Sequence, residues 1–96
     1  MAGFIQIIEF RSSRADEIRK LGDDIDREGG TAVRISVTED RDQPGHFFTI
    51  AEFDSYESAM ENSNRPETSE FAAKMAELCD GPPTFHNLDV SESWSR

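Results

Sequence analysis

The 96-residue sequence predicts an α+β domain whose strands and helices follow the order β-α-β-β-α-β. Three observations predict it: strand-like and helix-like apolar patterns alternate, polar or Pro/Gly breaks separate them, and the length suits one domain. With right-handed crossovers this order gives the split βαβ, or ferredoxin-like, arrangement around a four-stranded antiparallel sheet. We treat residues 1–96 as a single domain with a polar C-terminal tail at 91–96.

An apolar strand is predicted at the start of the chain. The run Phe4 to Phe10 (F-I-Q-I-I-E-F) has Gln6 as its one uncharged polar interruption. Such a run is typical of a strand that is covered on both faces. A buried amide needs hydrogen-bond partners, so Gln6 could either orient a ligand in a pocket or satisfy a neighbouring backbone group.

A helix and a half-solvated strand are expected next. Ser12 and Ser13 can cap a helix whose apolar residues recur at helical spacing, and Gly29-Gly30 is expected to end it. Residues 31–38 (T-A-V-R-I-S-V-T) then alternate between apolar and polar. This alternation predicts a strand with one wet face, near an edge of the sheet.

A hairpin and a short capped helix follow in the prediction. Residues 39–45 (E-D-R-D-Q-P-G) form a polar loop that leads into a strand at His46–Phe53. Asp54, with Glu57 three residues later as its capping-box partner, is expected to start a helix over about residues 55–62.

The last two elements are a longer helix and a fourth strand. Pro66 fits the first turn of the helix, which carries an apolar stripe made of Phe71, Ala72, Met75 and Leu78. Gly81-Pro82-Pro83 ends this helix, and residues 84–90 (T-F-H-N-L-D-V) form the strand.

The charge of the chain excludes some partners. With 20 acidic and 10 basic residues, the net charge is -10, and a field of this sign repels nucleic acids and anionic membranes. The acidity fits either a high-salt cytoplasm or an ordinary solvated surface. The single cysteine, Cys79, cannot form an internal disulfide, and neither a secretory signal nor a membrane span is visible, so we expect a cytoplasmic protein.

Known cofactor motifs are missing from the sequence. It contains no phosphate-binding glycine loop, no C-x-x-C and no H-E-x-x-H. His46 and His86 both fall on predicted strands and could face each other, but no acid is placed by spacing to complete a metal site. We therefore predict neither a metal nor another cofactor.

Several apolar residues could line a pocket or simply fill the core. Phe48, Phe71 and Met75 fit both possibilities. The first strand is apolar on both sides, so the sheet face away from the helices also needs cover. In a short chain the natural cover is a second copy, which predicts a homodimer with two-fold symmetry.

The stretch Phe53–Met60 (F-D-S-Y-E-S-A-M) resembles the strand-to-helix turn of the antibiotic-biosynthesis-monooxygenase-like (ABM) domains, in the dimeric α+β barrel superfamily. The segments Q-I-I-E-F and S-E-F-A-A-K-M are also similar to segments of that family. The resemblance implies a homodimer with a pocket in each protomer. Some members oxidise polycyclic aromatic substrates without metal or flavin, others degrade haem, and many have no known activity.

The resemblance to the haem-degrading members is weakest at their functional positions. Those members use an Asn on the first strand and a Trp and a His in the helical region. The corresponding positions here are Gln6, a residue near Asn62, and a residue near Phe71. Without the ligand histidine, haem binding is not expected.

The leading functional hypothesis is a homodimer that binds a small aromatic or polyketide-like metabolite and acts as a cofactor-independent monooxygenase. Gln6 would hydrogen-bond the ligand, Phe48, Phe71 and Met75 would form walls, and His86 would accept a proton near neutral pH. The competing hypothesis is a non-catalytic ligand-binding or dimerisation module. A third, an acidic module for a basic partner, follows from the charge alone.

Overall fold

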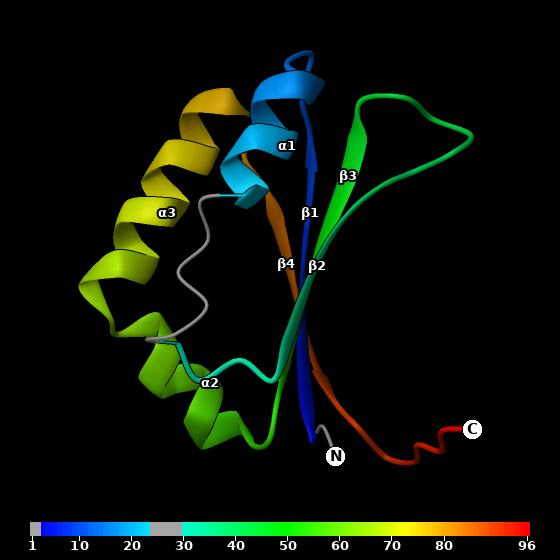
Figure 1. Cartoon of the computed structure of the whole chain (residues 1–96), viewed down its shortest axis with the longest axis vertical. Helices are drawn as coiled ribbons and strands as arrows, with labels where there is room; N and C mark the ends of the chain where they lie inside the picture. Colours follow the sequence, from blue (N-terminus) through cyan, green and yellow to red (C-terminus); the bar gives the residue numbers. More distant parts are fainter. Residues whose placement is uncertain (1–2, 24–29) are drawn as a thin grey trace.

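The computed structural model describes residues 3–23 and 30–96. One four-stranded antiparallel sheet carries the helices on one of its faces, and the other face is open (Figure 1). The sheet order β2-β3-β1-β4 confirms the predicted ferredoxin-like α+β arrangement, with β1 in the interior and β2 and β4 at the edges. The elements are β1 (Phe4–Arg11), α1 (Ala15–Asp23), β2 (Arg34–Glu39), β3 (His46–Phe53), α2 (Tyr56–Ser63), α3 (Pro66–Leu78) and β4 (Thr84–Asp89).

The alternation of side chains along β1 defines the two faces of the sheet. Phe4 and Phe10 are buried and point toward the helices. Ile5, Ile7 and Glu9 point to the other side and are only half-buried. We call the first side the covered face and the second the open face. The continuous apolar run in the sequence thus supplies apolar side chains to both faces of β1, an interior strand.

Two clusters of buried residues fix the helices to the sheet, one at each end of the covered face. At one end the rings of Phe10 and Phe47 stack with their centroids 5.4 Å apart. At the other end Phe4 meets Tyr56 edge to face, also at 5.4 Å. Burial of each such side chain contributes about 1.5–3 kcal/mol. The clusters consist of Phe10, Ile18, Leu21, Phe47 and Met75, and of Phe4, Ala51, Phe53 and Ala59.

The helix starts differ in part from the prediction. Ser55, not Asp54, caps α2, because its backbone is extended and its hydroxyl accepts the Ser58 N–H at 3.1 Å. Pro66 occupies the first turn of α3, as predicted. The predicted end of the first helix at Gly29-Gly30 depends on residues 24–29, which lie outside the described part of the chain.

Strand β2 is an edge strand, as predicted, but it begins later than expected. Thr31, the predicted first residue, bonds to α2 instead: its hydroxyl donates to the Ser58 carbonyl at 2.6 Å, and its N–H donates to Asn62 Oδ1 at 3.3 Å. Ladder pairing with β3 starts at Arg34. Side-chain bonds to a helix thus replace strand pairing at this end.

Strand β4 is exposed along its whole length and ends at Asp89, one residue before the predicted boundary. It leaves Phe85 and Leu88 largely uncovered. The polar tail that follows runs away from the sheet on the side opposite the helices (Figure 1). No helix in the described residues has the length and apolarity needed to cross a membrane.

Candidate functional site

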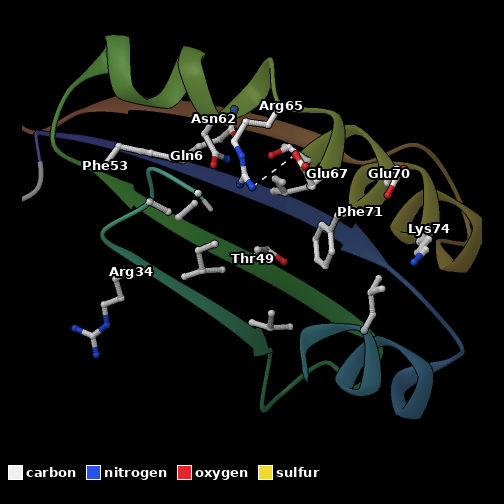
Figure 2. A pocket seen from close by; sticks show the side chains of 18 of the residues that line it. Gln6, Arg34, Thr49, Phe53, Asn62, Arg65, Glu67, Glu70, Phe71 and Lys74 are labelled. Atoms are coloured by element: carbon white, nitrogen blue, oxygen red, sulfur yellow. Dashed lines mark ion pairs between the residues drawn. The ribbon is translucent and has the colours of Figure 1, made fainter. Parts of the chain in front are cut away.

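A pocket of about 730 Å³ lies on the covered face, between the sheet and helix α3 (Figure 2). Its floor comes from the three strands β1, β2 and β3, and its roof from the end of α2 and the first turns of α3. The lining includes Gln6, Ile8, Ile35, Val37, Thr49, Ala51, Phe53, Asn62, Arg65, Thr68, Phe71 and Lys74.

The register of the sheet explains why the space is left empty. Side chains in the middle of the covered face are of modest size: Thr49 pairs with Ile8 and Val37, and the next row is centred on Ala51. The rows at the two ends carry the large rings that fill the core clusters. The rings at the two ends hold the helices away from the sheet, and the smaller side chains between them do not fill the gap, which leaves the cavity.

Several polar groups around the pocket already have partners. The Gln6 amide donates to Asn87 Oδ1 on β4 at 3.1 Å, and Asn62 Oδ1 accepts the Thr31 N–H. Arg65 lies 3.6 Å from the Glu67 carboxylate. Figure 2 shows that the Arg34 side chain points away from the cavity.

Thr49 differs from these groups. It is only 4 % exposed, and its hydroxyl has no hydrogen-bond partner among the described residues. Sequence reasoning missed this residue, because a threonine in an apolar strand is an ordinary β-former. Only the pairing register shows that its side chain forms the centre of a pocket floor.

The structure separates the residues predicted to contact a ligand. Gln6 and Phe71 both line the pocket. Met75, one turn further along α3 than Phe71, is buried in the core cluster with the stacked phenylalanines. Phe48 and His86 lie on the open face, because they pair with Glu9 and Ile7 of β1. They are therefore on the opposite side of the sheet from this pocket.

A second group of functional side chains occupies the open face. The Glu9 carboxylate lies between the two histidines, 2.8 Å from His46 Nε2 and 3.1 Å from His86 Nε2. The spacing along the sequence does not reveal an acid beside the histidines, but the structure places Glu9 between them. Glu9 lies on the strand between theirs and meets both diagonally, a relation that appears only with the register.

The chemistry of this group is that of a paired carboxylate. Hydrogen bonds from His86, then from His46, lower the pKa of Glu9 below its ordinary value of 4.5. Such a carboxylate is a weaker base than an ordinary one. In the described part of the chain, no three His, Cys, Asp or Glu side chains are arranged to hold a metal ion. The geometry therefore supports a structural ion-pair network better than a catalytic base.

The open face also carries an apolar strip. Ile5 and Ile7 on β1 and Phe48 and Ile50 on β3 are half-buried, and Leu88 on β4 is exposed. Apolar strips with polar groups around them are common at interaction surfaces.

Comparisons with known proteins identify the fold. No family model matches the chain, and no curated protein matches it. Among solved structures, a candidate antibiotic biosynthesis monooxygenase from Deinococcus radiodurans matches with a TM-score of 0.81 and 19% identity over 97% of each chain. Rv0793 from Mycobacterium tuberculosis matches with a TM-score of 0.81 and 18% identity over 98% of this chain and 100% of that one. The chain has an ABM-like fold.

A third similar structure supports the same assignment. It is a candidate monooxygenase of this kind from Chloroflexus aurantiacus, with a TM-score of 0.77 and 15% identity over 96% of each chain. Within the ABM-like fold, Gln6, Asn62 and Phe71 all line the pocket. These three residues, from β1, α2 and α3, therefore lie around one site.

Proposed function

We propose that this chain is a homodimeric ABM-like protein that binds a small aromatic or polyketide-like metabolite in the pocket of the covered face. The observation that carries the proposal is the pocket itself. Its volume of about 730 Å³ falls within the range of small-molecule sites, roughly 300–1,000 Å³. Its floor is largely apolar, as is typical of such sites, whereas its roof carries polar and charged side chains such as Arg65, Glu67 and Lys74.

The lining suits a flat ring. Phe71 extends from α3 over the floor, where it faces the strands (Figure 2). The aliphatic side chains of Ile8 and Val37 form the floor on either side of Thr49. An aromatic ligand between this ring and this floor would gain both apolar burial and ring stacking.

The homodimer is supported by the open face. Its apolar strip would be covered if two sheets packed face to face, in the aligned geometry that such sheets prefer. Several polar groups in the same face already bind one another, as Glu9 does with His46 Nε2 and His86 Nε2. A second copy could therefore cover them at a modest desolvation cost.

A pocket-filling variant tests ligand binding. Ala51→Phe places a ring in the middle of the floor, and Thr68→Trp fills the cavity from the roof. In a thermal-shift screen with naphthalene- and anthracene-type compounds, the wild type should gain stability and both variants should not. Ala73→Phe, at an exposed position of α3, is the control and should respond like the wild type. If both filled variants keep the full ligand response, the pocket is not the binding site.

A second candidate function is oxygenation of the bound ligand without a metal or flavin. Its support is the names of the structural neighbours, several of which are candidate monooxygenases. The expected result is O₂ consumption with a polycyclic phenol that stabilises the wild type, and its loss in Ala51→Phe. If no stabilising compound supports O₂ consumption, the function is ligand binding without catalysis. That His86 accepts a proton in this reaction remains a prediction. His86 lies on the open face, on the other side of the sheet from the pocket.

A further inference from the structure

We propose that the Thr49 hydroxyl is the polar anchor of the pocket and that it selects ligands carrying a hydroxyl or carbonyl oxygen. This inference rests on the proposed binding function and narrows its ligand class to oxygenated aromatics, such as phenols and quinones. Thr49 then determines specificity by hydrogen-bonding the ligand directly.

The first support is the state of the hydroxyl. Only 4 % of the Thr49 surface is exposed, and its Oγ1 has no partner among the described residues. Buried polar groups are almost always hydrogen-bonded, and one without a partner destabilises the fold. A ligand oxygen in the pocket would supply the missing partner.

The second support is the lack of a packing reason for the hydroxyl. Thr49 lies in a row with Val37 and Ile8, both β-branched and apolar. A valine at position 49 would have the same shape and would complete this row without a polar atom. The hydroxyl of Thr38 offers a contrast, because it donates to the Phe48 carbonyl at 2.7 Å. Thr38 thus has a structural hydrogen bond, whereas Thr49 has none among the described residues.

The third support is the position of Thr49 relative to the rest of the pocket. Figure 2 shows Thr49 beside the ring of Phe71. The Gln6 amide, by contrast, already donates to Asn87. A flat ligand that packs under Phe71 would place an edge oxygen at Thr49. Because a hydroxyl both donates and accepts, phenols and quinone-type carbonyls would both satisfy it.

The test compares two probes of similar shape, 2-naphthol and 2-methylnaphthalene, by NMR titration or calorimetry. Their affinity ratio is measured in the wild type and in Thr49→Val, so that the different hydrophobicity of the probes cancels. We expect the ratio to fall about tenfold in Thr49→Val, as for loss of one buried hydrogen bond. Thr49→Ser, which keeps the hydroxyl, should retain most of the preference. Thr38→Val is the matched control and should keep the wild-type ratio.

A second readout needs no ligand. If the hydroxyl has no structural partner, Thr49→Val should melt at the same temperature as the wild type or higher, whereas Thr38→Val should melt lower. If Thr49→Val binds both probes with the wild-type ratio, the inference is wrong and the pocket remains a binding site. If neither probe binds the wild type, while circular dichroism shows it folded, the proposed function fails and this inference with it.

Discussion

The polar groups of the two sheet faces differ in their surroundings. On the open face, Glu9 binds both His46 and His86, and the Thr38 hydroxyl bonds to a backbone carbonyl. On the covered face, under the helices, Thr49 has no partner among the described residues. His46 Nδ1 on the open face also has no partner among the described residues, but of the two unsatisfied atoms only Thr49 Oγ1 belongs to a residue that lines the pocket.

This difference points to a different kind of partner for each face. A surface on which most polar groups already bind one another can be covered by a second apolar surface with little loss. An unsatisfied group in a cavity instead favours a ligand that completes it. We therefore associate the open face with assembly and the covered face with ligand binding.

The largest expected effect is on assembly. Ile50 lies on the open face, directly beside Ile7 of β1. In a two-fold dimer, Ile50→Lys would bury two lysines against apolar strands, which costs at least about 3 kcal/mol, or roughly a hundredfold in dimer affinity. Light scattering after gel filtration should show a dimer for the wild type and a monomer for Ile50→Lys.

The control for this prediction is Ala73→Lys, which adds the same charge at an exposed position on α3. It should remain dimeric. A dimeric Ile50→Lys protein would mean that the open face is not the interface.

A pair of phenylalanines separates the two faces more sharply. Phe71 lines the pocket, and Phe48 lies on the open face beside the His46 ring, with ring centroids 4.7 Å apart. Phe71→Leu should weaken 2-naphthol binding about tenfold through lost stacking, and leave the dimer intact. Phe48→Leu should weaken the dimer and leave ligand affinity unchanged. Titration and sedimentation of both variants would show the opposite result if the faces were wrongly assigned.

Much of the fold could be predicted because apolar patterns encode it directly. The predicted strand His46–Phe53 has the bounds of β3, and Pro66 starts α3 as expected. The errors fall where a side chain competes with the backbone for hydrogen bonds. Thr31 bonds to α2 and delays β2, and Ser55 replaces the expected cap.

The site was less predictable because it depends on which way each strand residue points. Phe47 and Phe48 are adjacent and both apolar, so the sequence alone does not say which one faces the helices. The structure places Phe47 in the core and Phe48 on the open face. The Glu9–histidine network and the Thr49 floor position likewise require the register of three strands, which no local pattern contains.

A smaller effect on stability is expected from the hydrogen bonds that join helices α1 and α3 above the covered face. Ser12 is buried, and its hydroxyl joins the start of α1 to the end of α3: it accepts the Arg14 N–H at 3.0 Å and donates to the Leu78 carbonyl. Ser12→Ala should lower the free energy of unfolding by about 1–2 kcal/mol in urea titrations. Ser13→Ala, next to it but exposed, should change the free energy by less than about 0.5 kcal/mol. Equal losses in the two variants would show that the Ser12 bridge contributes nothing specific.

The smallest effect concerns the pH dependence of the open face. Histidine hydrogen bonds lower the pKa of Glu9 in the folded protein below 4.5. As the pH falls, the unfolded chain therefore takes up this proton before the folded protein does. The stability that Glu9 contributes is fully present above pH 4.5 and is lost as the pH falls through the lowered folded pKa.

Glu9→Gln removes this titration. Below pH 4.5, the free energy of unfolding should therefore fall less steeply in the variant than in the wild type, so that the two curves converge in acid. Urea titrations between neutral pH and pH 3 provide the measurement, and Glu92→Gln in the exposed tail is the control. If the difference between wild type and Glu9→Gln is the same at every pH, the carboxylate charge is not what the histidines stabilise. The contrast between the open face and Thr49 would then rest on hydrogen-bond partners and not on charge.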